Sequence, residues 1–141
     1  MADKQIEIKK IRLSNQMDAL QKINRKLEEL GNKWELPDPF VMKINLVLEE
    51  AFTNIVKHAY RDQQAHTILL AFEKHENRLI ITFEDDGIAY DPTKASDPDI
   101  SLDAKDREVG GLGIFLIRQM MDEVRYERRE NTNILRMEKS Y

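Results

Sequence analysis

The chain has 141 residues, with 22 Lys and Arg against 26 Asp and Glu, which gives a formal net charge of -4. This length suits one domain around one core, and we expect residues 1–141 to form it. An acidic balance without a basic run argues against direct nucleic-acid binding. Because cysteine is absent and only three histidines occur, neither disulfides nor a zinc enzyme is expected.

The sequence also bears on location. It contains no apolar run of the length that a signal peptide or a membrane span requires. We therefore expect a cytoplasmic protein that does not attach to a membrane.

Hydrophobic spacing predicts a strand and then a helix at the N-terminal end. Residues 4–13 alternate imperfectly between apolar and polar, as a strand does. Apolar residues then recur at steps of three and four over 17–30, which predicts one face of a helix. Ser14 or Asn15 is suited to cap this helix, and Gly31 is suited to end it.

A second helix and two strands are expected next. The proline-containing turn at 35–39 leads into apolar residues at helical spacing over 40–60. Two runs rich in β-branched and aromatic residues follow at 66–73 and 78–85. The short polar turn between them predicts a β-hairpin.

The C-terminal half predicts a loop, a helix and a last hairpin. Residues 86–107 hold two prolines and few large apolar groups, and so long a loop is usually functional. A helix is expected at 112–121, and strands at 123–130 and 133–140 flank a turn around "NTN". This order predicts the α+β class: a two-layer α/β sandwich whose mixed, mostly antiparallel sheet carries its helices on one face.

The stretch "LVLEEAFTNIVKHAY" (46–60) places polar residues on the second helix. Glu50 and Asn54 stand four residues apart and therefore share a helix face, which Lys57 and His58 continue. An Asn carbonyl oxygen suits Mg²⁺, and a carboxylate one turn away could take a proton from a hydroxyl group. A solvated helix face with Glu–Lys pairs explains the same residues.

The stretch "FEDDGIAYDP" (83–92) ends a strand in acids and a glycine. Asp86 lies where the chain leaves the sheet, and Gly87 lets another group approach the backbone. A buried carboxylate accepts hydrogen bonds only, so it fits the exocyclic amine of adenine and repels the carbonyl of guanine. A simple Asp-Gly turn is the alternative.

The stretch "EVGGLGIFLIRQMMDEV" (108–124) has three glycines in four positions before a helix. It matches neither the Walker P-loop nor the dinucleotide fingerprint. Backbone N–H groups at the start of a helix nevertheless bind phosphate without a lysine. A glycine-rich joint without a ligand is the alternative.

Taken together, the three stretches resemble the GHKL ATPase superfamily. "EEAFTNIVKHAY", "DDGIAYDP" and "GGLGIFLIRQMMDEVRYERRENTNILRMEK" look most like the bacterial anti-sigma factor serine-protein kinases. The resemblance covers about residues 5–139 and implies a Bergerat ATP-binding fold with a mobile lid at about 93–109. It also implies ATP and Mg²⁺ as cofactors and serine/threonine-protein kinase activity.

Residue roles follow from the same resemblance, position by position. Glu50 matches the catalytic base, Asn54 the Mg²⁺ ligand and Lys57 a lysine that approaches phosphate. Asp86 matches the adenine-binding aspartate and Gly87 its neighbour. Ala89 stands where the superfamily has a second glycine, a departure that bears on lid closure. The lid-end residues that wrap the phosphates are Gly110, Gly111, Leu112 and Gly113.

The resemblance also implies partners. A kinase of this family phosphorylates a STAS-domain antagonist, which competes with a sigma factor for the kinase, whereas a nucleotide-dependent anti-sigma binding module would lack the transfer step. Relatives use a basic residue of the first helix for partner contact, and Lys22, Arg25 and Lys26 are available. Family members commonly dimerise, so a homodimer through the first strand and helix is left open.

Overall fold

A computed structural model of the chain describes residues 6–94 and 111–141. Two short 3-10 turns, η1 (Met17–Ala19) and η2 (Pro92–Lys94), accompany the regular elements. In chain order these elements are β1 (Glu7–Ser14), α1 (Leu20–Lys33), α2 (Asp38–His58), β2 (Thr67–Lys74), β3 (Arg78–Asp85), α3 (Gly111–Met120), β4 (Glu123–Arg129) and β5 (Thr132–Ser140).

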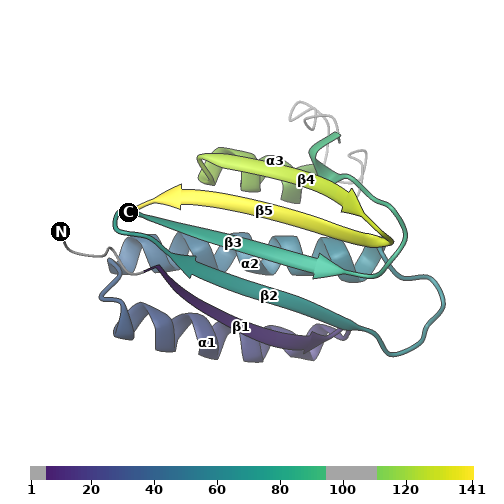
Figure 1. Cartoon of the computed structure of the whole chain (residues 1–141), viewed down its shortest axis with the longest axis horizontal. Coiled ribbons are helices and arrows are strands. Elements are labelled where there is room, and N and C mark those ends of the chain that lie inside the picture. Colours follow the sequence, from purple (N-terminus) through teal and green to yellow (C-terminus); the bar gives the residue numbers. More distant parts are fainter. Residues whose placement is uncertain (1–5, 95–110) are drawn as a thin grey trace.

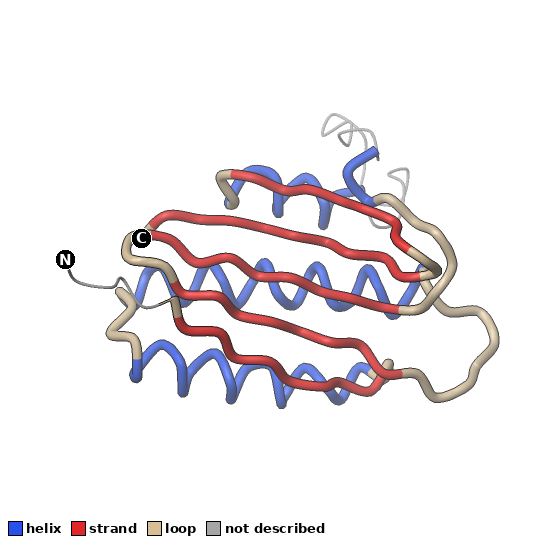
Figure 2. Tube along the Cα trace, viewed as in Figure 1, coloured by secondary structure: helices blue, strands red, loops and turns tan. Residues whose placement is uncertain are grey.

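The strands form one sheet in the order β1-β2-β3-β5-β4, and every neighbouring pair is antiparallel. All three helices pack on the same face of this sheet, with α1 behind β1, α2 behind the centre and α3 behind β4 (Figures 1 and 2). The predicted two-layer α+β sandwich is confirmed. The sheet is antiparallel throughout its described strands rather than mixed.

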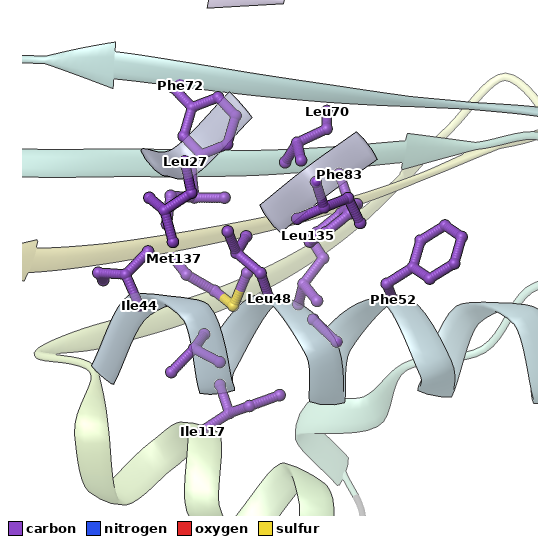
Figure 3. Packing of buried hydrophobic residues seen from close by; sticks show 14 of the residues in the cluster. Leu27, Ile44, Leu48, Phe52, Leu70, Phe72, Phe83, Ile117, Leu135 and Met137 are labelled. Carbon is purple, nitrogen blue, oxygen red and sulfur yellow. The ribbon is translucent and has the colours of Figure 1, made fainter. Parts of the chain in front are cut away.

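The core fills the space between the sheet and the helices. Helix α2 supplies Ile44, Leu48 and Phe52, each separated by four residues and therefore on one face (Figure 3). They belong to the same buried cluster as inward-facing strand residues such as Phe83 on β3. Ile117 of α3 adds to this cluster. Each such side chain, fully buried, contributes about 1.5–3 kcal/mol. Because α2 is held this firmly, the polar residues on its remaining surface have fixed positions.

The start and end of α1 differ from the expectation. The helix continues two residues beyond Gly31, to Lys33. A Cβ at Gly31 would lie 3.1 Å from Val41 Cγ2, so this glycine allows α1 and α2 to approach rather than ending a helix. Asn15 does not cap α1, because its side chain bonds the backbone of Gln64 and His66 in the segment before β2.

The last hairpin turns earlier than expected. Its two turn residues, Glu130 and Asn131, have φ values of 46° and 65°, and Arg129 pairs with Thr132 across the hairpin. Thr132 and Asn133 therefore belong to β5 and not to the turn. Because side chains alternate along a strand, this register turns Asn133 towards the helix layer, where it is buried.

Among the helices in the described part of the chain, none combines the length and the apolar character needed to cross a membrane.

Candidate functional site

The predicted site residues gather at one end of the molecule. The C-terminal end of α2, the end of β3 and the start of β5 lie together there, next to the start of α3 (Figure 1). Three stretches that are separate in sequence thus meet in space. The site is built along the surface of α2, from Glu50 to Ala59.

Glu50 meets the glycine-rich start of α3. A Cβ added at Gly113 would lie 2.7 Å from Glu50 Oε2, so the carboxylate sits directly against the α3 backbone. The sequence placed these two residues in separate motifs. The structure brings them into contact, which puts a carboxylate beside the helix start that was expected to face phosphate.

Asn54, one turn further along α2, shares a small cavity with the end of β3. The cavity has a volume of about 20 Å³, room for one water molecule. Asn54, Asp85 and Asn133 supply much of its polar lining, and Tyr90 and Pro92 cover it from the segment after β3. An amide, a carboxylate and an apolar wall therefore converge on one point between α2 and the sheet.

Asp85, the last residue of β3, is the buried carboxylate of this site, with 5% of its surface exposed. Its Oδ1 accepts hydrogen bonds from the Gly87 backbone N–H and from Asn133 Nδ2, both at 2.9 Å. Burial raises the pKa of the Asp85 carboxyl above its usual value, and the two hydrogen bonds oppose that rise. This combination is typical of a functional carboxylate.

Asp86, which was expected to be the buried carboxylate, is exposed and does not line this cavity. Its side chain is 62% exposed. Asp86 Oδ1 accepts a hydrogen bond from Tyr60 at 2.9 Å and lies 3.4 Å from His66 Nδ1. The interpretation of Asp86 as a buried acceptor is therefore wrong. Since successive strand residues point to opposite faces, a shift of one residue was enough to cause the error.

Gly87 has a structural reason to be glycine. A Cβ there would lie 2.3 Å from the Ala59 carbonyl oxygen, far inside van der Waals contact. The same carbonyl accepts a hydrogen bond of 2.8 Å from the Ile88 N–H. The group that approaches the backbone at Gly87 is thus the end of α2. This contact fixes the end of β3 against the helix that carries Glu50 and Asn54.

Ala89, the departure from the superfamily pattern, is exposed and does not have a positive φ. Its backbone conformation is one that alanine adopts freely. The structure therefore gives no reason for glycine at this position.

His58 and Lys57 occupy the last turn of α2. The His58 ring stacks on Tyr90 with centroids 4.7 Å apart, and its buried Nε2 has no hydrogen-bond partner in the described part of the chain. Burial, followed by the charges of Lys57 and Arg61, lowers the pKa of His58. Lys57 is exposed, so its ammonium is free to reach towards an anion at the site.

The expected lid falls largely outside the described residues. Gly110 and residues 95–109 are not described, and of the expected lid only Thr93 and Lys94 are, within η2. Gly111, Leu112 and Gly113 form the first turn of α3, in agreement with a helix beginning there. Backbone N–H groups of this first turn lack partners within the helix.

Of the three basic residues of α1 considered for partner contact, two have partners within the chain. Lys22 donates a hydrogen bond of 2.7 Å to the Arg12 carbonyl, and Lys26 pairs with Glu29 at 3.4 Å. Arg25 is exposed.

Two site residues escaped the sequence analysis. The spacing D-x-G, counted back from Gly87, gives Asp85, so the signal for this residue was present. Asn133 was expected at the boundary between the turn and the last strand, and only the hairpin register shows that it faces Asp85.

The donor set argues against a metal site made of protein groups alone. In the described part of the chain, no cluster of three or more His, Cys, Asp or Glu could hold a metal ion. A single amide oxygen such as that of Asn54 fits Mg²⁺ that takes most of its ligands from phosphate and water.

The fold and the site define an ATPase domain of the histidine-kinase type. The family model for the histidine kinase-like ATPase domain matches residues 13–139, and the chain belongs to this family.

Its relatives include Serine/threonine-protein kinase BtrW of Bordetella bronchiseptica. The identity is 32% over 106 residues, which make up 75% of this chain and 73% of that protein. Serine-protein kinase RsbW of Bacillus cereus is 33% identical over 96 residues, covering 65% of this chain and 59% of that protein. The chain thus spans less than two thirds of the length of that second relative.

Solved structures agree on the fold. The SiaB-SiaC complex from Pseudomonas aeruginosa matches with a TM-score of 0.65 at 16% identity, over 94% of this chain and 88% of that chain. The Acinetobacter baumannii histidine kinase AdeS matches with a TM-score of 0.51 at 14% identity, over 95% of this chain and 68% of that chain. At these identities the likeness concerns the fold alone.

Proposed function

We propose that this chain is a Mg-ATP-dependent protein-serine/threonine kinase that acts on a STAS-type anti-sigma factor antagonist. The observation that supports it most is that Asn54 of α2 and the buried Asp85 of β3 line one cavity, while Glu50, one turn earlier on α2, lies against the start of α3. The names of the relatives, serine/threonine-protein kinase and serine-protein kinase, support the reaction type.

Asp85 is the residue that would bind adenine, by accepting a hydrogen bond from its exocyclic amine. Its Oδ1 is occupied by Gly87 and Asn133, whereas Oδ2 accepts no hydrogen bond from the described part of the chain. An ionised carboxylate accepts a hydrogen bond from the adenine amine and repels the guanine carbonyl. This assignment replaces the one that the sequence analysis made for Asp86.

The cavity beside Asp85 must open to admit a purine. At about 20 Å³ it is far smaller than the roughly 300–1,000 Å³ of ligand pockets in general. Tyr90 and Pro92 cover it, and Tyr90 is held by its stacking on His58. ATP binding would therefore displace the segment that carries Tyr90, and this segment leads directly into the expected lid.

Asn54 and Glu50 would carry the phosphate end of the reaction. Asn54 would offer its amide oxygen to Mg²⁺, which would neutralise phosphate charge when bound. Glu50 would accept the proton of the attacking Ser or Thr hydroxyl, whose oxygen forms the new bond to the γ-phosphorus as ADP leaves. The first turn of α3 and Lys57 would offset the remaining phosphate charge.

Partner switching would follow from such a reaction. An unphosphorylated antagonist and a sigma factor would compete for this protein, and phosphorylation would remove the antagonist from the competition. Exposed Arg25 on α1 is a candidate for partner contact, since Lys22 and Lys26 already have partners within the chain.

The proposal is tested by incubating the protein with labelled ATP, Mg²⁺ and a STAS-domain protein encoded near it. Label on a serine or threonine of that protein is expected, and Glu50→Gln should reduce it at least about a hundredfold, the scale of general base catalysis. Glu49→Gln, the matched change one position earlier, should leave it near the wild-type level. Tight ATP binding without any label would favour the nucleotide-dependent binding module instead.

A further inference from the structure

The two polar side chains buried in the described part of the chain are Asp85 and Asn133, with 5% and 4% of their surfaces exposed. They bond to each other, Nδ2 to Oδ1, at 2.9 Å. Burying a polar amide is unfavourable unless all its groups find partners. Asp85 already has a proposed role in this site, whereas buried Asn133 has none.

Every hydrogen-bonding position of the Asn133 amide is used. Nδ2 also donates to the Ile88 carbonyl at 2.8 Å. Oδ1 accepts from Tyr126 OH at 2.5 Å and from Arg128 Nη1 at 3.1 Å. Because a flipped amide would direct its NH₂ group at two donors, these neighbours fix its orientation.

Arg128 is fixed in turn by the turn after β3. Its Nη1 donates to the Gly87 carbonyl at 2.7 Å as well as to Asn133. Tyr126 and Arg128 both come from β4, where Tyr126 pairs with Leu135 and Arg128 pairs with Asn133 across the hairpin. The last hairpin therefore presents a pre-formed set of donors to the end of β3.

We propose that Asn133 is a positioning residue for purine recognition: held by Tyr126 and Arg128, it engages Oδ1 of Asp85 and so directs Oδ2 at the exocyclic amine of adenine. This inference rests on the proposed function, because it takes Asp85 as the adenine reader. Asn133 acts on the nucleotide only through Asp85, by orienting this carboxylate and by favouring its ionised form.

The chemistry of the pair explains why an amide serves here. An amide N–H stabilises the charged form of a neighbouring carboxylate, and a second carboxylate would destabilise it. Two hydrogen bonds on one oxygen also fix the plane of the carboxylate, which a single bond would leave free to rotate. Recognition of an amine needs both properties, ionisation and a fixed direction.

The test is Asn133→Asp, which keeps the shape of the side chain and replaces the donor with an acceptor. The dissociation constant of Mg-ATP should rise about tenfold or more at neutral pH, as expected when a hydrogen bond to a charged group is lost. The ratio of mutant to wild-type dissociation constants should shrink as the pH is lowered, because a shared proton restores a hydrogen bond between the two carboxyl groups.

Asn131→Asp is the matched control, since it adds the same charge two residues away in the exposed turn. It should leave the dissociation constant within about twofold of wild type at every pH, well under the tenfold step that 1.4 kcal/mol represents. If Asn133→Asp loses no more affinity than Asn131→Asp does, at any pH, the proposal is overturned. Circular dichroism and urea denaturation of each variant exclude misfolding as the cause.

A second, milder variant keeps the proposal testable if Asn133→Asp fails to fold. Tyr126→Phe removes one donor to Asn133 Oδ1 and should lower the preference for ATP over GTP several-fold. Tyr141→Phe is its control, because the Tyr141 hydroxyl bonds the His75 carbonyl, away from the site. An unchanged ATP-to-GTP ratio in Tyr126→Phe would contradict the positioning role.

The failure of this inference is distinguishable from the failure of the proposed function. If Asp85→Asn binds Mg-ATP as well as wild type does, the assignment of Asp85 as the adenine-binding residue is wrong. If Asp85→Asn abolishes binding while the Asn133 and Tyr126 variants bind as wild type does, only the positioning role is wrong. A carboxyl carbon NMR titration of the nucleotide-free protein adds a readout that is independent of activity: Asn133→Asp should raise the Asp85 midpoint.

Discussion

Gly113 of α3 lies so close to Glu50 of α2 that a Cβ on the glycine would be 2.7 Å from Glu50 Oε2. The contact joins the start of the glycine-rich helix to the carboxylate proposed as the base. Helices α2 and α3 pack against each other and both contribute side chains to the buried core, so the contact belongs to a packed interface. A glycine at 113 is therefore a requirement of the Glu50 position.

Gly113→Ala should lower phosphate transfer by moving the Glu50 carboxylate, while Mg-ATP affinity changes much less. The methyl group has to displace the Glu50 carboxylate, which is the far end of a flexible side chain, so the carboxylate should move at little cost to the stability of the fold. Single-turnover transfer and ATP titration separate the two effects.

Gly31→Ala is a fitting control, since it makes the same change inside a helix. Its Cβ would meet only the Val41 side chain at 3.1 Å, and the better helix propensity of alanine offsets this by up to about 1 kcal/mol. Equal transfer rates in Gly113→Ala and Gly31→Ala would show that the Glu50 contact has no role.

Gly87→Ala should destabilise the fold. Its Cβ would overlap the Ala59 carbonyl oxygen at 2.3 Å, and this carbonyl cannot move away without breaking the end of α2. We expect a loss of about 1–3 kcal/mol in the free energy of unfolding, measured by urea denaturation.

Ala89→Gly makes the reverse substitution, alanine to glycine, two residues further along the chain. Ala89 is exposed and has no positive φ, so restoring the superfamily glycine should leave ATP affinity unchanged. A marked gain in affinity would mean that the backbone at 89 moves on binding in a way that this structure does not show.

Binding of Mg-ATP should weaken as the pH falls, with a midpoint above the usual carboxyl value of 3.8. Burial raises the pKa of Asp85, and only the ionised carboxylate accepts a hydrogen bond from the adenine amine without donating one. Protons therefore compete with ATP, and affinity is lost as the pH passes down through this raised pKa. Isothermal titration calorimetry across the acid range measures the midpoint.

Asp86→Asn should keep an acid midpoint above 3.8, since Asp86 affects Asp85 only through its charge and stands outside the cavity. Removing that charge should lower the midpoint slightly, because Asp86 adds to the rise in the Asp85 pKa. An affinity that stays constant down to pH 4 would show that Asp85 is not the acceptor.

The sequence predicted much of this architecture, because helix and strand periodicity are local signals. The face of α2 that carries Glu50 and Asn54 followed directly from their spacing of four residues. The sheet order and the position of α3 beside Glu50 depend on contacts between distant segments, which no local pattern contains.

The errors at the site have a common physical origin. Asp85 and Asp86 are neighbours with the same side chain, but Asp85 is the last residue of β3, on its buried face, whereas Asp86 follows the strand and is exposed. Likewise, Asn133 was expected where the turn meets the last strand, and its sequence position alone does not show which face of the sheet its side chain takes. The turn instead uses Glu130 and Asn131 at positive φ, so the register moved Asn133 into the core.

Calorimetric titration of Mg-ATP into Asp85→Asn and Asp86→Asn decides whether Asp85 or Asp86 accepts the hydrogen bond from adenine. Asp85→Asn keeps a side-chain oxygen that can accept the hydrogen bonds from the Gly87 N–H and Asn133 Nδ2, so the variant should stay folded at neutral pH. We expect Asp85→Asn to stay folded and to lose ATP binding, whereas Asp86→Asn should keep it. Retained binding in Asp85→Asn together with lost binding in Asp86→Asn would show that Asp86 is the adenine-binding residue.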